Sequence, residues 1–171
     1  MLVRLNVSEL EEALPIASGL EKEKNFQEAA DSVRHRIAHI LHEPGAFLNR
    51  AICYLLRDTY MQPHFHPSKE KAERIWVLEG KVAVIAFNDG GEVVDVAELE
   101  AGSLSGVQVP PFTWHTYIML TDRVITYETM EGVYDPVTWK TFADWAPAED
   151  RMDAQSYSES LRNSYLVFIA D

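Results

Sequence analysis

The 171-residue sequence contains a single cysteine, Cys53, and it has no apolar run of about 18 residues. One cysteine cannot form an internal disulfide, which favours a reducing compartment such as the cytoplasm. A membrane-spanning helix would need the long apolar run that is missing. The first ten residues also lack an apolar core and become acidic at Glu9, unlike a signal peptide. We therefore expect a cytoplasmic protein without a membrane segment.

Basic residues are scarce as well, with 15 Lys and Arg against 27 Asp and Glu and a formal net charge of −12. Such a charge repels a phosphate backbone, so we expect no nucleic-acid partner. The arginines and lysines are scattered, apart from Arg34 and Arg36. These two either hold a carboxylate or phosphate or pair with neighbouring Asp and Glu, and the acidic composition favours pairing.

The hydrophobic pattern changes near residue 49. Before this point, Ser8 and Glu11 form a capping-box pattern for a short helix over residues 9–14, and Asn25 is expected to cap a helix over residues 26–42. After it, short segments with a two-residue period alternate with turn signals such as Glu79-Gly80. They predict strands over residues 50–57, 60–66, 73–78, 81–88, 93–99, 106–109, 115–120 and 123–130. This succession, without helices between the strands, predicts a mainly β sandwich or jelly-roll barrel.

We expect a single domain, because 47% hydrophobic residues suffice for one core and no repeat or linker is visible. Residues 1–48 would form an N-terminal helical extension, residues 49–130 the barrel and residues 131–171 a partly irregular C-terminal wrap. The last apolar segment, residues 165–170, is either a final strand or an association surface. We expect a homodimer.

Metal-ligating residues are concentrated in the stretch from Tyr60 to Gly80. His64 and His66 stand two residues apart in a predicted strand, so their side chains share one face. Two neighbouring imidazoles with a carboxylate from the next strand form an N/O metal site on a sheet. A third imidazole must come from elsewhere, and His115 is the candidate.

The order of these residues resembles the two motifs of the cupin family, over residues 50–130. The first motif is His-x-His, then a glutamate, then a glycine seven residues later, as in His64-x-His66, Glu73 and Gly80. The second motif is a proline followed by a histidine five residues on, as in Pro110 and His115. The resemblance implies the cupin double-stranded β-helix. It also implies one divalent ion bound by His64, His66, Glu73 and His115.

The sequence departs from the cupin motifs in three places. His66 and Glu73 are separated by six residues rather than three or four, and Glu70 lies at the usual distance. We favour Glu73, because its interval to Gly80 matches the motif and Glu70 lies in a lysine-flanked turn. The other departures are Phe112 at the position of a motif glycine and Met119 at that of an asparagine.

A narrower resemblance links the chain to the WbuC-type cupin metalloproteins, bacterial proteins associated with surface-polysaccharide gene sets. It spans residues 32–149, with Val133 where that family usually has proline. The resemblance implies metal binding and does not define a reaction. The matching features are Ser32-x-Arg34-x-Arg36, His42, Thr59-Tyr60, Pro63-His64-x-His66, Glu128, Gly132-x-Tyr134 and Trp145-Ala-Pro-Ala-Glu149.

Three imidazoles and one carboxylate suit Fe(II), Mn(II), Ni(II), Co(II) or Zn(II). Open positions on such an ion would accept a small polar molecule, for example a carbohydrate. Glu128 and Tyr117 are the candidate catalytic residues for moving a proton, and Glu128 could instead support a ligand. The hypotheses are a metal-dependent isomerase or epimerase, a dioxygenase, and a binding module without turnover. A mainly structural role through self-association comes last.

Aromatic residues near the histidines are candidates for the mouth of the pocket, where their faces would stack on a sugar or another ring. Tyr60, Trp114 and Tyr117 flank the predicted ligands. Tyr117 is the strongest of the three, because the two-residue period places it on the same strand face as His115.

A second group of histidines falls in the predicted helix over residues 26–42. His35, His39 and His42 recur at i, i+4 and i+7, and histidines at i and i+4 can chelate zinc. No acidic residue stands between them, and their face also carries Glu28 and Asp31. We favour a solvated polar face over a metal site.

Overall fold

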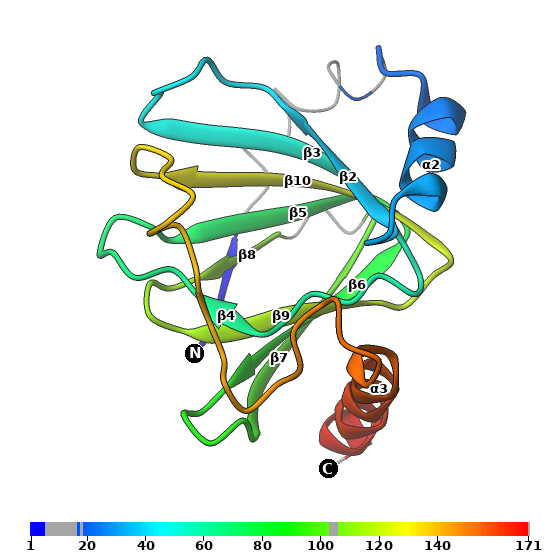
Figure 1. Ribbon diagram of the computed structural model, residues 1–171, viewed down its shortest axis with the longest axis vertical. Helices are drawn as coiled ribbons and strands as arrows, with labels where there is room; N and C mark the ends of the chain where they lie inside the picture. The colour runs from blue at the N-terminus through cyan, green and yellow to red at the C-terminus, as the bar shows by residue number, and fades with distance from the viewer. Residues whose placement is uncertain (6–16, 18, 103–105, 171) are drawn as a thin grey trace.

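The computed structural model describes residues 1–5, 17, 19–102 and 106–170. Within them, two antiparallel sheets face each other (Figure 1). The order is β1-β8-β5-β10-β3-β2 in the six-stranded sheet and β11-β4-β9-β6-β7 in the five-stranded sheet. No strand pairs across the two sheets in this part of the chain, so they form an open sandwich and not a closed barrel. The mainly β prediction is confirmed.

The predicted strands agree closely with the observed ones. Seven of the eight predicted strands both begin and end within two residues of an observed strand. The exception is the strand predicted over residues 60–66, which begins four residues too early. The first sheet contains β1 (Val3–Leu5), β8 (Gly106–Val109), β5 (Glu73–Glu79), β10 (Arg123–Glu131), β3 (Leu48–Leu56) and β2 (Arg36–Ile40). The second contains β11 (Thr141–Phe142), β4 (His64–Phe65), β9 (Trp114–Met119), β6 (Lys81–Phe87) and β7 (Val93–Glu100).

The shortened strand β4 has a local cause. Pro63 has no backbone N–H to contribute to a ladder, so pairing begins only at His64. Before it, the Tyr60 carbonyl accepts a hydrogen bond from the Arg36 guanidinium at 2.9 Å instead of pairing with a strand.

The helix predicted over residues 26–42 is wrong in its second half. Helix α2 spans Lys22–Asp31, with Glu21 rather than Asn25 at its N-cap. The chain then turns through Val33, which is 96% exposed, and through His35 at φ +53°. Residues 36–40 form strand β2, which pairs with β3. Residues 1–48 therefore contribute two strands to the sheet, and the helix predicted at residues 9–14 lies outside the described residues.

The second histidine group is not on a helix, so the predicted i, i+4, i+7 face does not exist. His39 lies on strand β2 and its Nε2 is 2.9 Å from the Asn25 side-chain oxygen. His42 follows the strand, and its Nδ1 accepts from the Arg50 backbone N–H at 2.9 Å. Both rings are used in local hydrogen bonds, which fits a structural role.

The C-terminal apolar segment is helical rather than a strand. Residues 165–170 form the end of helix α3, which spans Ala154–Ala170. The helix packs through Leu161 and Tyr165 against the five-stranded sheet (Figure 1). The role of this segment in self-association stays a prediction. None of the helices described by the structure has the length and apolar character needed to cross a membrane.

The hydrophobic core fills the space between the sheets. Its largest cluster includes Ile75 and Val77 of one sheet and Val84 and Met119 of the other, all less than a tenth exposed. Helix α2 covers the outer face of the six-stranded sheet through Phe26, and α3 lies on the five-stranded sheet. The packed core therefore holds β5 of one sheet close to β4 and β9 of the other.

Candidate metal centre

Four side chains from the two facing sheets meet between them: His64, His66, Glu73 and His115. His64 on β4 is the direct cross-strand partner of His115 on β9, and His66 follows β4. Glu73 begins β5 in the opposite sheet. One potential ligand atom of each residue lies within 4.8 Å of the others. The structure thus brings together the four residues that the sequence indicated.

The turn before His115 is hydrogen-bonded to His66 of the first motif. Phe112 occupies the position of the motif glycine, and its φ is +59°, in the left-handed region that glycine favours. Its backbone N–H donates to the His66 carbonyl at 3.2 Å. The backbone at Phe112 therefore has a conformation that glycine adopts more easily than phenylalanine.

All three rings use Nδ1 in a hydrogen bond to a backbone carbonyl. The acceptors are Gln62 for His64 at 3.0 Å, Trp139 for His66 at 2.8 Å and Thr113 for His115 at 2.8 Å. A carbonyl oxygen only accepts, so each Nδ1 carries the proton. In the neutral rings, each Nε2 is therefore an unprotonated lone pair.

These lone pairs converge on a carboxylate that also has no proton to offer. Glu73 Oε2 lies 2.9 Å from His115 Nε2 and 3.3 Å from His66 Nε2. The Nε2 of His64 is buried without a hydrogen-bond partner in the described part of the chain. A divalent cation satisfies four such acceptors at once, and ligating histidines typically fix their second nitrogen on a carbonyl in this way. The residues present therefore fit one metal ion.

The electrostatics favour the protonation states that a metal site needs. Burial, together with Lys140 and the other two rings, holds the pKa of His64 well below its usual value, so this ring is neutral. Burial alone would raise the pKa of Glu73. When His115 and His66 are protonated, the hydrogen bonds that they donate and their charge outweigh burial and hold the pKa of the Glu73 carboxyl well below its usual range. Neutral imidazole and ionised carboxylate are the forms that bind metals.

The alternative carboxylate is placed elsewhere. Glu70 is exposed in the turn before β5, where hydrogen bonding to Ser68 lowers the pKa of its carboxyl. It is absent from the group of four, whose carboxylate is Glu73. The longer spacing between His66 and Glu73 accommodates this exposed turn.

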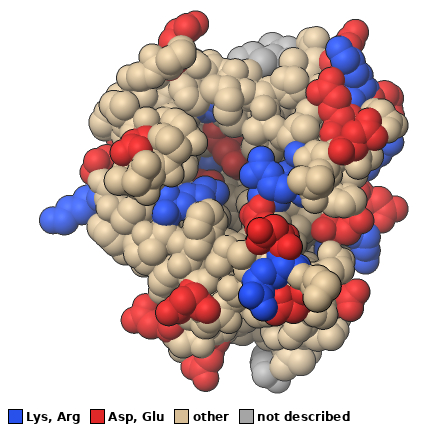
Figure 2. All heavy atoms as spheres, viewed as in Figure 1, with Lys and Arg blue, Asp and Glu red and all other residues tan. Residues whose placement is uncertain are grey.

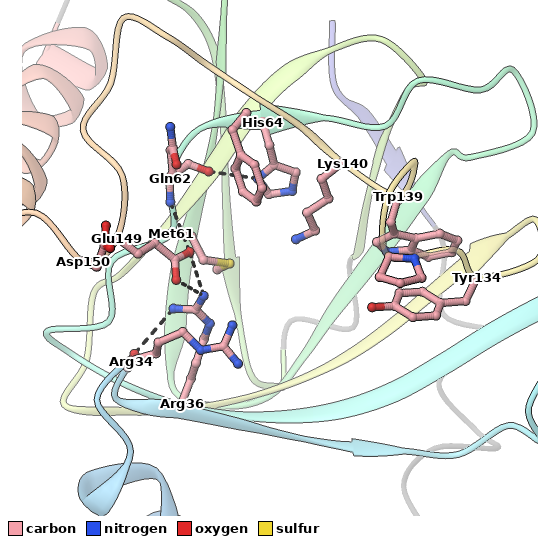
Figure 3. A pocket seen from close by; sticks show the side chains of 12 residues that line it. Arg34, Arg36, Met61, Gln62, His64, Tyr134, Trp139, Lys140, Glu149 and Asp150 are labelled. Atoms are coloured by element: carbon pink, nitrogen blue, oxygen red, sulfur yellow. Dashed lines mark hydrogen bonds and ion pairs between the residues drawn. The ribbon is translucent and has the colours of Figure 1, made fainter.

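Two adjoining cavities reach the four-residue group. The outer cavity has a volume of about 430 Å³ and its lining includes Arg34, Arg36, His64, Trp139, Lys140 and Phe142 (Figure 3). The inner cavity, of about 150 Å³, is lined by residues that include Arg50, Glu73, Glu128, Tyr134, Trp139 and Lys140. The outer cavity reaches the group at His64 and the inner cavity reaches it at Glu73.

The two candidate proton-transfer residues differ in their access to these cavities. Glu128 on β10 lines the inner cavity with Glu73, and its Oε1 accepts from the Thr126 hydroxyl at 2.7 Å. Burial and the Glu73 charge raise the pKa of the Glu128 carboxyl to about 7. Tyr117 is 3% exposed in the core, and burial and Glu73 raise the pKa of its hydroxyl well above the usual value. Glu128 is therefore the accessible one.

The prediction that aromatic residues near the histidines line the mouth of the pocket is wrong for Tyr60 and Trp114. Tyr60 is buried and its hydroxyl donates to the Pro147 carbonyl at 2.8 Å. Trp114 packs on Phe65 and Trp145, away from the two cavities. With Tyr117 in the core, none of the three predicted residues lines either cavity.

The aromatic lining comes instead from the C-terminal segment, residues 131–153. Tyr134 and Trp139 pack edge to face with ring centres 5.0 Å apart. Lys71, only 6% exposed, lies over the Trp139 ring at 4.6 Å and donates to the Thr138 carbonyl. The segment also supplies the carbonyl that orients His66. The sequence did not indicate that these residues line the cavities. It shows only that this stretch is rich in aromatic residues and has no periodicity.

The carboxyl of Glu128 provides a pH-dependent prediction. The folded pKa of about 7 exceeds the ordinary value of 4.5, so ionising this carboxyl lowers the free energy of unfolding. The whole loss is present above pH 7, and none of it remains below about pH 4.5. Glu128→Gln should therefore raise the free energy of unfolding of metal-free protein by about 1–3 kcal/mol at pH 8. The gain should shrink towards pH 5, as urea unfolding in a chelator can measure.

Glu131→Gln, on the same strand and at its surface, is the matched control and should show no such gain. Equal effects of Glu128→Gln at pH 5 and pH 8 would contradict the assignment of the raised pKa to this carboxyl.

Comparisons with known proteins agree with this architecture. Residues 21–99 match a family described as "Domain of unknown function (DUF6016)". A search of the curated proteins found no match. Among solved structures, CapF in complex with 3-isopropenyl-tropolone is similar at a TM-score of 0.50 and 14% identity, over 62% of this chain and 34% of that one.

Two further structures give somewhat lower scores. One is a protein from Klebsiella pneumoniae with a double-stranded β-helix domain: TM-score 0.49, 14% identity, 64% of this chain and 80% of that one. The other is dTDP-4-dehydrorhamnose 3,5-epimerase from Elizabethkingia anophelis: TM-score 0.48, 12% identity, 69% of this chain and 86% of that one. Identities this low bear on the fold alone. The likeness to CapF agrees with the mainly β fold of two facing antiparallel sheets.

Proposed function

We propose that this protein is a cupin metalloprotein that binds one divalent ion through His64, His66, Glu73 and His115. The observation that carries the proposal is the commitment of all three Nδ1 protons to backbone carbonyls. It directs three Nε2 atoms and a carboxylate oxygen at one another, and His64 Nε2 has no hydrogen-bond partner in the described part of the chain. The ion is Fe(II), Mn(II), Ni(II), Co(II) or Zn(II), all of which accept this donor set.

The ligand of this centre, in our proposal, is a small polar molecule such as a sugar, handled in bacterial surface-polysaccharide metabolism. A bound divalent ion would supply a Lewis acid that polarises a carbonyl or hydroxyl oxygen of the ligand. Tyr134 and Trp139 offer apolar ring surface beside the inner cavity. The WbuC-type resemblance supports this setting, and the sites of metal and ligand are adjacent.

Turnover, if present, would use Glu128 to take or give the proton. Its pKa of about 7 suits a group that must exchange a proton near neutral pH. An isomerase or epimerase would need this step, whereas a dioxygenase would consume oxygen in its iron form. Tyr117 remains the second candidate, although its burial favours a supporting position beside His115. A metal-dependent binding module without turnover is the alternative, and it is favoured if the metal-loaded wild-type protein binds a ligand without converting it.

Metal content tests the centre directly. Purified wild-type protein should carry about one divalent ion per chain, and His64→Ala should lose it, because His64 supplies one of the four ligands. Mass spectrometry of the intact protein and elemental analysis measure both. His39→Ala, which removes a histidine from outside the centre, should keep its metal. A metal-free wild type, or a His64→Ala protein with full occupancy, would refute the four-ligand site.

A further inference from the structure

The outer cavity contains an unusual concentration of positive charge for so acidic a protein. Arg34, Arg36 and Lys140 line it beside His64, and Lys140 also lines the inner cavity. The chain as a whole has 27 acidic against 15 basic side chains. Figure 2 shows Lys and Arg side chains on both sides of a hollow near the middle of the face drawn there.

The three cations differ in what they contact. The Arg36 guanidinium is bound by both Glu149 oxygens at 2.7 Å, and it is therefore neutralised. Within the described residues, no hydrogen bond or ion pair involves the Arg34 guanidinium or the Lys140 ammonium. Many other cations of the chain do pair with carboxylates, for example Lys22 with Glu79 and Lys81 with Glu98.

The Lys140 side chain points into the cavity rather than out to solvent. Figure 3 shows it extending between His64 and the two arginines. It is half-buried, and it lines the same cavity as His64. A cation beside a divalent metal centre is repelled by the ion, and partial burial also removes some of its hydration. An anion held between them would remove this repulsion.

The carboxylates near the cavity form no ion pair with Arg34 or Lys140 in the described residues. Glu149 is engaged by Arg36, and Asp150 is exposed at the rim. Glu128 and Glu73 lie in the inner cavity, where Glu73 belongs to the metal centre. The unpaired cations therefore face open cavity, with the aromatic Trp139 beside them.

We propose that the ligand of this cavity is a small polar molecule with an anionic oxygen group, a carboxylate or phosphate, which Lys140 and Arg34 bind. This inference rests on the proposed function, because it places the neutral part of the ligand at the metal centre. The anionic group lies on the side of Arg34 and Lys140, and the carbon skeleton lies against Trp139. The protein thus selects acidic or phosphorylated sugars over neutral ones.

The test is isothermal titration of zinc-loaded protein with glucose 6-phosphate, glucuronate, glucose and inorganic phosphate. At least one of the two anionic sugars should bind tenfold more tightly than glucose. Comparison of glucose 6-phosphate with glucuronate identifies whether phosphate or carboxylate is preferred. Inorganic phosphate reports the charge contribution alone. Lys140→Ala should weaken anion binding tenfold or more without changing zinc stoichiometry, and Arg34→Ala should weaken it less because Arg34 is more exposed. Lys140→Arg should retain most of the affinity.

Lys24→Ala, which removes an exposed lysine on helix α2, is the matched control and should bind as the wild type does. The proposal is wrong if glucose binds as tightly as both anionic sugars, if Lys140→Ala binds them unchanged, or if no probe binds at millimolar concentration. Zinc stoichiometry is measured on every sample. Loss of zinc from the wild type would refute the metal centre, and the same titrations on that protein would still decide the role of Lys140.

Discussion

Removing the metal ion is expected to lower the free energy of unfolding by about 4 kcal/mol, when the free ion stands a thousandfold above its dissociation constant. The reason is that only the folded chain assembles His64, His66, Glu73 and His115 from two sheets. Chemical unfolding with excess zinc and with a chelator measures the difference. Because protons compete for the same lone pairs, the difference should decrease as the pH falls from 8 to 5.

The effect of Glu73→Gln on the free energy of unfolding should change sign between the metal-free and the zinc-loaded protein. The glutamine amide can donate to His115 Nε2 and His66 Nε2, which face the carboxylate at 2.9 and 3.3 Å. Without metal at pH 8, this variant should therefore be more stable than the wild type by about 1 kcal/mol. With zinc it should be less stable, because a ligand and its charge are gone. Destabilisation of equal size with and without zinc would contradict the lone-pair arrangement.

The control for both measurements is Glu131→Gln, whose carboxylate lies at the surface near Arg74. It should leave the zinc-dependent gain in stability unchanged. A zinc effect of undiminished size in Glu73→Gln would contradict the assignment of Glu73 as a ligand.

Local patterns were sufficient to predict most of the strands and the four potential metal ligands that meet between the sheets. The strands are rich in β-branched and aromatic residues and end at turn residues, and both signals are contained in ten or fewer residues. The centre was predictable because its motif spacings are specific, even where Phe112 replaces a glycine. The φ of Phe112, +59°, lies in the left-handed region that glycine favours.

The errors came from features that depend on distant contacts. Apolar residues at spacings of three and four suggested one helix through Ile37 and Ile40, but the edge of β3 pairs with residues 36–40 as a strand. Val33, which lies within the predicted helix, is exposed in the turn that separates α2 from β2. A short apolar run fits either period, and only the partner strand decides between them.

The cavity lining was missed for a related reason. Residues 131–153 have almost no regular structure, so no periodicity indicates which side chains face inward. Their path is set by single contacts with distant residues, such as Gln62 Nε2 to the Ala143 carbonyl at 2.9 Å and Arg36 to Glu149. Trp139 and Lys140 reach the cavity through these contacts. Interactions between residues so far apart in the chain carry no local signal in the sequence.

Gly80→Ala is expected to produce the largest loss of stability among single small substitutions near the site. Gly80 alone separates β5 of the six-stranded sheet from β6 of the five-stranded sheet, so the chain changes sheets across one residue. Its φ is +79°, which costs an L-residue about 1–2 kcal/mol. An added Cβ would also lie 2.3 Å from the Arg123 carbonyl oxygen and 2.5 Å from Thr121 Oγ1.

The close approach is to backbone, so the substitution must move the start of β10 away from β5. Overpacking of this kind adds about 1–3 kcal/mol, and we expect a total near 4 kcal/mol by urea unfolding. Gly45→Ala separates the two causes, because Gly45 has φ +82° with open space around it. It should cost about 1–2 kcal/mol.

Equal losses for the two variants would mean that the contact with Arg123 relaxes freely. If Gly80→Ala loses more stability than Gly45→Ala, it should also weaken zinc binding. The reason is that the moved strands carry Glu73 on β5 and Glu128 on β10. The motif glycine would then act on the metal centre by fixing how β5 meets its neighbours. It has no side chain to touch the ion, so its effect on zinc must pass through the position of Glu73.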